Sequence, residues 1–168
     1  MKSPDIYIGL GANLPSLSHG APKATLAAAL DRLAAEGLHI LARSRWYESA
    51  PVPRSAQPWF VNAVVRVETS LAPPALLQLL HRVEAEFGRV RGERNAARAI
   101  DLDLIAYGDR VTPRGAVPIL PHPRMQERAF VLLPLHEIAK RWRHPLLRRS
   151  IDELIAALPS DQVARPLA

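Results

Sequence analysis

Two aspartates lie one residue apart in the segment 98–110, RAIDLDLIAYGDR, which otherwise has the composition of a buried strand. Residues two apart in a strand share a face, so Asp101 and Asp103 should point the same way, with the apolar residues between them facing the core. Carboxylates this close repel each other and raise one pKa unless a cation lies between them. Mg²⁺, which takes oxygen ligands and often bridges to substrate phosphates, would relieve the repulsion. Solvation on an exposed face, or pairing with arginine, is the alternative interpretation.

An arginine-rich segment immediately precedes the aspartates. Four arginines occur within ten residues of GRVRGERNAAR: Arg89, Arg91, Arg94 and Arg98. The planar guanidinium group suits bidentate contacts with phosphate. A basic loop with glycines that leads into two metal-binding carboxylates is the arrangement expected for a bound polyphosphate. Taken alone, the segment could equally be a solvated basic loop.

Two further segments carry side chains suited to a flat, polar ligand. In WFVNAVV, Phe60 and Asn62 share a strand face, where a ring can stack on a heterocycle and an amide can bind its edge. A packed strand with one polar residue is the alternative there. The segment 120–130, LPHPRMQERAF, adds one histidine, two arginines and a phenylalanine: His122, Arg124, Arg128 and Phe130.

Composition limits the function classes. The chain has 168 residues, 48% of them apolar, and a net charge of +6 with no cysteine, which indicates one globular domain, residues 1–168, without disulfide or thiolate chemistry. The basic balance favours anionic partners, although a bias towards arginine codons would give the same total. There is no signal peptide, no membrane-spanning apolar stretch and no P-loop, so a cytoplasmic protein is expected.

The elements that must position these residues alternate between strand and helix patterns. Strands are predicted at 5–10, 39–49, 59–70 and 98–107, and helical segments at 23–37 and 73–88, both ending on glycine. Residues 127–139 should form a short helix interrupted near Pro134, and 150–159 a last helix capped by Ser150. This order predicts an α+β fold, a ferredoxin-like sandwich whose mostly antiparallel sheet carries helices on one face and leaves the other free for a ligand.

The quoted motifs, together with GLGANL and RNAARAIDLDLIAYG, resemble those of the hydroxymethyldihydropterin pyrophosphokinases of the folate pathway, in the same order over about residues 5–140. The resemblance implies transfer of pyrophosphate from ATP, the co-substrate, to the hydroxymethyl group of 6-hydroxymethyl-7,8-dihydropterin, which releases AMP. It also implies two Mg²⁺ ions between the triphosphate and the pair Asp101 and Asp103.

The resemblance assigns roles to individual positions. Its catalytic positions are Arg89, Arg98, Asp101 and Asp103. Its ATP-binding positions are Leu77, His81, Arg89, Arg91, Arg94, Arg98, Leu104, His122 and Arg128. Its pterin-binding positions are Gly11, Ser49, Ala50, Val52, Phe60, Asn62 and Phe130, with the ring between the two phenylalanines and its edge on the asparagine. Glu84 matches a position with a structural or loop-anchoring role.

Some positions depart from the family pattern, and other functions stay open. Asn95 stands where some members have tryptophan, and Ala97 and Ala50 stand where proline is usual, which affects the details of loop closure. The expected partners are the two small-molecule substrates, without nucleic acid or membrane, and the expected state is a monomer. The alternatives are a magnesium-dependent nucleotidyl- or phosphotransferase with another heterocyclic acceptor, or a basic RNA-binding ferredoxin-like module. The RNA-binding module would need several exposed aromatic residues, and this chain is only 5% aromatic.

Overall fold

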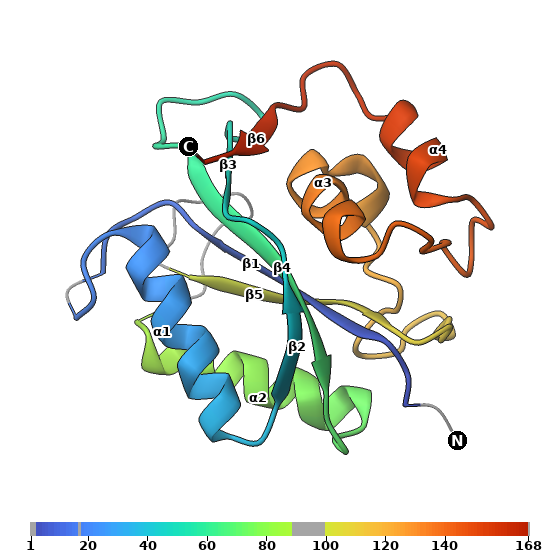
Figure 1. Cartoon of the computed structure of the whole chain (residues 1–168), viewed down its shortest axis with the longest axis horizontal. Coiled ribbons are helices and arrows are strands. Elements are labelled where there is room, and N and C mark those ends of the chain that lie inside the picture. Colours follow the sequence, from blue (N-terminus) through green and yellow to red (C-terminus); the bar gives the residue numbers. More distant parts are fainter. Residues whose placement is uncertain (1–2, 17, 89–99, 168) are drawn as a thin grey trace.

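The computed structural model describes residues 3–16, 18–88 and 100–167 (Figure 1). The strands in these ranges are β1 (Ile6–Ala12), β2 (His39–Arg43), β3 (Tyr47–Ser49), β4 (Phe60–Glu68), β5 (Asp101–Tyr107) and β6 (Ala164–Pro166). The helices there are α1 (Pro22–Ala35), α2 (Pro73–Glu86), a 3-10 turn (Met125–Glu127), α3 (Ala129–Ile138) and α4 (Ile151–Ala156). The observed order of the first elements is β-α-β-β-β-α-β, which matches the predicted β-α-β-β-α-β order except that one predicted strand is divided into two.

The strands form one antiparallel sheet in the order β5-β1-β4-β3-β6, with β2 also paired to β4. Strand β1 therefore lies between β4 and β5, the two strands that carry the polar residues singled out above. The α+β class and the antiparallel sheet are confirmed. Strand β6, at the edge next to β3, was not predicted.

The single strand predicted for 39–49 is wrong in one respect, because β2 and β3 are separate strands that pair with successive parts of β4. The break occurs at Ser44, which is buried. Its N–H donates to Val64 O at 2.9 Å, but its hydroxyl replaces its carbonyl as the acceptor for Val64 N at 3.0 Å. The side chain thus replaces a backbone hydrogen bond between the paired strands and interrupts the strand.

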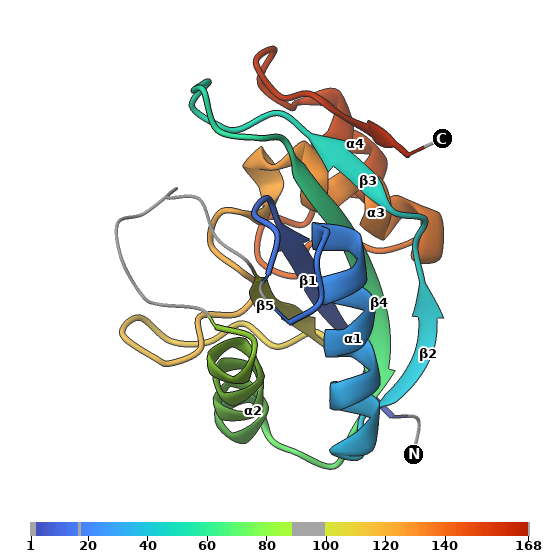
Figure 2. The same ribbon diagram turned by 90° about the vertical axis from the view of Figure 1, so that its left-hand side faces the viewer.

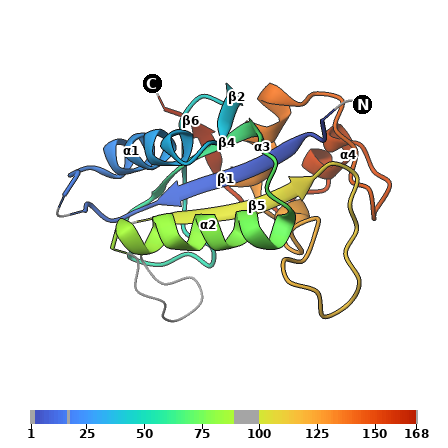
Figure 3. The ribbon, with the colours of Figure 1, turned by 90° about the horizontal axis from the view of Figure 1, so that it is seen from below.

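Helices α1 and α2 cover one face of the sheet (Figure 2). Their leucines, such as Leu26, Leu33 and Leu80, pack against alternate residues of β1, β4 and β5 and are fully buried. Each helix starts at a proline and is followed by a glycine with positive φ, Gly37 at 96° and Gly88 at 88°. Proline at the first position and glycine just past the end are the expected helix boundaries. Figure 3 shows α2 running alongside β5.

The other face is not free, contrary to the prediction. Helices α3 and α4 pack on part of it through a second apolar cluster that includes Ile105, Val131, Leu135 and Ile151. Figure 1 shows this pair of helices on the opposite side of the sheet from α1 and α2. The ligand-binding part of this face is therefore restricted to what α3 and α4 leave uncovered.

The two C-terminal helices differ in how well they were predicted. The interruption of α3 near Pro134 is wrong, because the helix continues through this residue. Proline removes one helical hydrogen bond, but Pro134 is buried and its neighbours Leu132 and Leu135 pack against the sheet. The cap of α4 is confirmed: Ser150 Oγ accepts Glu153 N, and Glu153 Oε1 accepts Ser150 N, each at 3.1 Å.

None of the helices in the described ranges is both long enough and apolar enough to cross a bilayer.

Candidate active site

Strand β5 places both aspartates on the sheet face that α1 and α2 do not cover. Leu102 and Leu104, the residues that alternate with them, are buried in the core under α1 and α2. The predicted division of this strand into an apolar and an acidic face is therefore confirmed. Across the sheet, Asp103 lies opposite Gly9 and Asp101 lies opposite Gly11.

The two glycines of β1 keep the sheet bare between the aspartates and β4. Gly11 pairs with Asp101 on one side and with Asn62 on the other. A Cβ atom at Gly11 would lie 3.0 Å from Asn62 Nδ2, closer than ordinary side-chain contacts allow. At Gly9 a Cβ atom would lie 3.3 Å from the terminal methyl group of Ile105. The absence of side chains here leaves room for a flat ligand against the backbone of β1.

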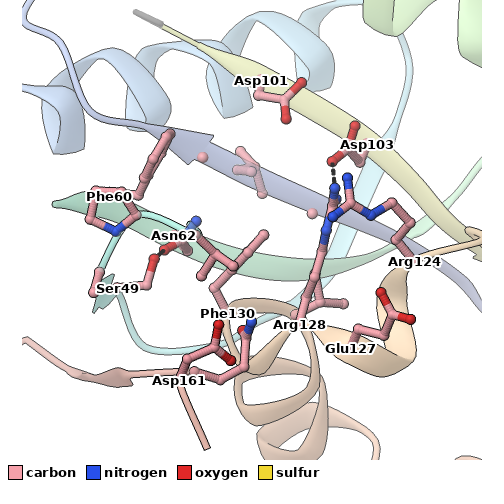
Figure 4. A pocket seen from close by; sticks show the side chains of 18 of the residues that line it. Ser49, Phe60, Asn62, Asp101, Asp103, Arg124, Glu127, Arg128, Phe130 and Asp161 are labelled. Atoms are coloured by element: carbon pink, nitrogen blue, oxygen red, sulfur yellow. Dashed lines mark hydrogen bonds and ion pairs between the residues drawn. The ribbon is translucent and has the colours of Figure 1, made fainter. Parts of the chain in front are cut away.

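A cavity of about 340 Å³ lies over this bare region (Figure 4). Its floor is the sheet. Its walls come from the β3–β4 connection, from α3 and from the C-terminal segment 159–167. The residues that line it include Gly9, Gly11, Ser49, Ala50, Pro51, Val52, Phe60, Asn62, Asp101, Asp103, Arg124, Glu127, Arg128, Phe130, Pro159, Asp161 and Gln162. We call it the first cavity.

One end of the first cavity combines aromatic rings with a fixed amide. Phe60 and Asn62 share a face of β4, as predicted, and Phe130 comes from the start of α3. Ser49 Oγ donates to Asn62 Oδ1 at 2.6 Å, and both residues are buried. The hydrogen bond holds the amide in one orientation, so it can act as a specific donor towards a ligand.

The other end of the first cavity is charged. Arg128 Nη1 lies 3.9 Å from Asp103 Oδ2, and its guanidinium group lies 5.4 Å from the ring of Phe130. Burial, followed by the charge of Asp101, raises the pKa of Asp103 to about 8, while Arg128 opposes the shift. The surroundings of Asp103 therefore disfavour its charged form.

A second cavity, of about 330 Å³, meets the first at the two aspartates. Its walls come from α2, β5 and the connection between β5 and the 3-10 turn. It is lined by Leu77, His81, Glu84, Leu102, Leu104, Ala116, Val117, Pro118, Ile119, His122 and Pro123, together with Asp101 and Asp103. Asp101 and Asp103 are therefore common to both cavities.

His122 is held in a neutral form beside the second cavity. Burial, and then the charge of Arg128, lowers the pKa of His122 to about 4. Its backbone N–H donates to Ile105 O at 2.8 Å, and its Nδ1 accepts Arg124 N at 3.2 Å. With Nδ1 used as an acceptor, the proton of the neutral ring is on Nε2, which makes that nitrogen a donor.

Glu84 joins α2 to the acidic strand. Its carboxylate accepts the backbone N–H of Leu102 at 2.8 Å, between the two aspartates, and the residue is 2% exposed. The strand is thereby fixed where the aspartates must hold their position. This geometry fits the structural role that the resemblance implies for Glu84.

Most of the predicted site residues come together. The predicted pterin positions all line the first cavity, together with Asp101 and Asp103. Leu77, His81, Leu104 and His122 line the second cavity, whereas Arg128, predicted on the nucleotide side, lines the first. The four arginines Arg89, Arg91, Arg94 and Arg98 lie outside the described residues.

Several lining residues had no predicted role. Gly9 had a detectable signal, because it alternates with Gly11 on the same strand. Arg124 stood in a motif without an assigned role, although a charged residue next to a histidine and a second arginine suggested one. Pro159, Asp161 and Gln162 had no local signal, since only the folding of a distant segment brings them to the cavity.

Comparison with known proteins gives a consistent family. The sequence pattern described as 7,8-dihydro-6-hydroxymethylpterin-pyrophosphokinase matches residues 7–140, and its match ends before α4 and β6. Proteins named 2-amino-4-hydroxy-6-hydroxymethyldihydropteridine pyrophosphokinase are similar to this chain. The one from Synechocystis sp. is 42% identical over 150 residues, covering 88% of this chain and 73% of the relative. That from Methylorubrum extorquens is 44% identical (79% and 81% covered), and that from Pseudomonas aeruginosa is 41% identical (95% of each).

Proposed function

The chain belongs to the 7,8-dihydro-6-hydroxymethylpterin-pyrophosphokinase family and is therefore an ATP-dependent pyrophosphokinase, and we propose that its two cavities hold the two substrates of this reaction. The reaction transfers pyrophosphate from ATP to the hydroxymethyl group of 6-hydroxymethyl-7,8-dihydropterin and releases AMP. One observation carries the proposal: Asp101 and Asp103 lie where the two cavities meet. Groups transferred from one ligand to the other must pass this point.

The first cavity takes the pterin. Phe60 and Phe130 offer ring faces for stacking, and Asn62, held by Ser49, offers an amide to the heterocycle's edge. The bare backbone of Gly11 lets the ring lie against the sheet. A volume of about 340 Å³ is within the range of small-molecule sites.

The second cavity takes the nucleotide. Leu77 and Leu104 supply apolar surface, and His122 supplies a neutral donor that does not depend on pH near 7. We further propose that Arg89, Arg91 and Arg98 hold the phosphates and that Arg94, in the loop between them, also belongs to the ATP site. Arg89 and Arg98 would in addition stabilise charge on the transferred group. These roles follow from the resemblance.

The two aspartates fit a hard divalent cation. They provide oxygen donors from one sheet face. Burial, and then the charge of Asp101, raises the pKa of Asp103, and a bound cation would favour its charged form. Over the described ranges, no set of three or more His, Cys, Asp or Glu side chains is placed to hold a metal, so further ligands would come from triphosphate and water. We propose that Asp101 and Asp103 hold two Mg²⁺ ions, which when bound neutralise phosphate charge and lower the pKa of the acceptor hydroxyl.

The protein's own contribution is positioning and charge. Arg128 Nη1 lies 3.9 Å from Asp103 Oδ2, so its guanidinium charge lies beside the aspartates, where it can help to balance the charge of the phosphates. The fixed amide and rings orient the acceptor towards the aspartates. No side chain is required as a general base, because phosphoryl transfer depends mainly on alignment and electrostatic stabilisation.

We also propose that the chain acts as a single domain and a monomer in the cytoplasm, with small-molecule substrates and without nucleic acid or membrane. Light scattering on the purified protein tests the monomer, whose mass is 18.5 kDa.

The function is tested with purified protein, ATP, Mg²⁺ and 6-hydroxymethyl-7,8-dihydropterin. AMP should form in amounts equal to the pterin pyrophosphate, and only when the pterin is present. ATP hydrolysis at the same rate with and without the pterin, or formation of ADP in place of AMP, would contradict the proposal.

A further inference from the structure

The C-terminal segment 159–167 forms part of the first cavity, although it lies far along the chain from the motifs that form the rest. Pro159, Asp161 and Gln162 all line the cavity. The segment is fixed on one side by β6, which pairs with β3 and places Ala164 opposite Ser49. Ala50, the residue after Ser49, also binds this segment, because its backbone N–H donates to Val163 O at 3.0 Å. The segment therefore follows the wall that carries Ser49 and Ala50.

Side chains and the chain end strengthen this attachment. Arg165 Nε lies 2.6 Å from Glu48 Oε1, and the guanidinium group lies 5.0 Å from the ring of Trp59. Leu167 N donates to Trp46 O at 2.9 Å. Gln162 thus projects from a segment whose position is fixed independently of α3.

Gln162 makes a hydrogen bond with the opposite wall. Its Oε1 accepts the backbone N–H of Ala129 at 3.1 Å, across 33 positions of sequence. Ala129 is the first residue of α3, and the helix has neither a capping side chain from its N-cap residue Arg128 nor an acidic residue in its first turn. The first amides of a helix have no partner within the helix, and Ala129 is only 3% exposed. Gln162 therefore supplies a cap that the local sequence lacks.

The amide that Gln162 binds lies between two residues of the site. Arg128 precedes Ala129 and reaches towards Asp103, and Phe130 follows it and lines the pterin end of the first cavity. A shift of this backbone would move both side chains. A displacement of about 1 Å at a reacting site is enough to reduce rates substantially.

We propose that Gln162 is a positioning residue that sets Phe130 and Arg128 in the acceptor site by capping the N-terminus of α3. The proposal rests on the function proposed above and adds a determinant of pterin binding to it. Gln162 acts through Ala129 and needs no contact with the substrate. What it requires is an acceptor oxygen at the end of a side chain of this length.

Three variants separate the hydrogen bond from the bulk of the side chain. Gln162→Met keeps the approximate size but removes the acceptor, and Gln162→Asn keeps the amide but withdraws it by one methylene group. Gln162→Glu keeps an acceptor oxygen of the same reach, with a charge that a helix N-terminus tolerates well. Gln78→Met, at an exposed position of α2, is the matched control.

The measurement is kcat and KM for each substrate, together with thermal unfolding. Gln162→Met and Gln162→Asn should raise the pterin KM roughly three- to tenfold, the range for loss of one neutral hydrogen bond, with a smaller change in the ATP KM. Gln162→Glu should stay within about twofold of the wild type, and Gln78→Met should not differ from it. If Gln162→Met does not fold, the Asn and Glu variants give the same comparison.

Two results would overturn the inference. One is a pterin KM that is unchanged in both Gln162→Met and Gln162→Asn, and the other is a Gln162→Glu enzyme that is folded but as impaired as these two. Failure of the proposed function is distinguishable, because the wild-type protein itself would then form no pterin-dependent AMP.

Discussion

Ser49 Oγ donates a 2.6 Å hydrogen bond to Asn62 Oδ1, and both residues are almost completely buried. This contact joins β3 to β4 beneath the first cavity. It leaves the amide nitrogen of Asn62 facing the bare backbone at Gly11. The site thus has a donor whose direction is set by a neighbour and not by the ligand.

Ser49→Ala should weaken pterin binding without unfolding the protein. The variant leaves Asn62 Oδ1 without its donor and frees the amide to rotate, which should raise the pterin KM about fivefold, as expected for a hydrogen bond worth about 1 kcal/mol. The ATP KM should change little, because Ser49 does not line the second cavity. Steady-state kinetics with each substrate varied separately test this, and an equal rise in both KM values would argue against it.

Gly11→Ala should exclude the pterin from its place against the sheet. The added Cβ atom would lie 3.0 Å from Asn62 Nδ2, so the fixed amide must move. We expect a loss of at least tenfold in kcat/KM for the pterin, larger than for Gly9→Ala, whose Cβ meets the flexible end of Ile105 at 3.3 Å. Comparison of the two alanine variants under identical conditions decides this, and similar losses would show that Asn62 is not the sensitive contact.

Asp103→Asn should separate activity from stability. The amide cannot replace a carboxylate that holds a cation, so kcat should fall by about 10²–10³-fold or more. Without ligands, however, burial and then the charge of Asp101 disfavour the charged form of Asp103, and an amide carries no charge to bury, so the melting temperature at pH 7 should be equal to or higher than that of the wild type. Calorimetry with and without Mg²⁺ and ATP provides the check. A variant that is destabilised in the absence of ligands would show that Asp103 is already well compensated in the free protein.

Local patterns were sufficient for the parts of the fold that depend on local physics. The alternation in β5 placed the aspartates on one face, and proline and glycine marked the ends of α1 and α2. The same patterns failed where a distant contact decides the outcome. Ser44 interrupts a strand only because its hydroxyl meets Val64, and α3 continues through Pro134 because the helix packs on the sheet.

In the site, too, some features follow from local sequence patterns and others depend on distant contacts. Phe60 and Asn62 could be paired from their spacing, and the resemblance supplied the positions that chemistry alone left open. Nothing near Gln162 in the sequence indicates its contact with Ala129, because the two are 33 positions apart and the pairing of β6 with β3 holds the segment that carries Gln162. Walls built from separate segments of the chain cannot be derived from periodicity.

The loop between α3 and α4 depends on a neutral histidine, which makes stability pH-dependent. His144 is 3% exposed, and its Nδ1 accepts the backbone N–H groups of Leu146 at 3.2 Å and Leu147 at 3.0 Å. Protonation would place an N–H against these two donors, and burial lowers the pKa of His144 below its ordinary value of 6.5. The unfolded chain therefore binds this proton more readily than the folded protein does.

Because the folded protein binds this proton less readily than the unfolded chain, His144 makes the folded state less stable as the pH falls. The contribution of His144 is fully present above about pH 6.5, the unfolded-state pKa, and is lost as the pH falls towards the lower pKa of the folded state. His144→Asn, whose Oδ1 can accept from the same loop but does not titrate, should lose less melting temperature between pH 7.5 and 5.5 than the wild type. At pH 7.5 its kcat should be unchanged, because His144 lines neither cavity. Parallel melting curves for the two proteins across this range would exclude His144 as the titrating group, and a ring titration followed by NMR would give its pKa directly.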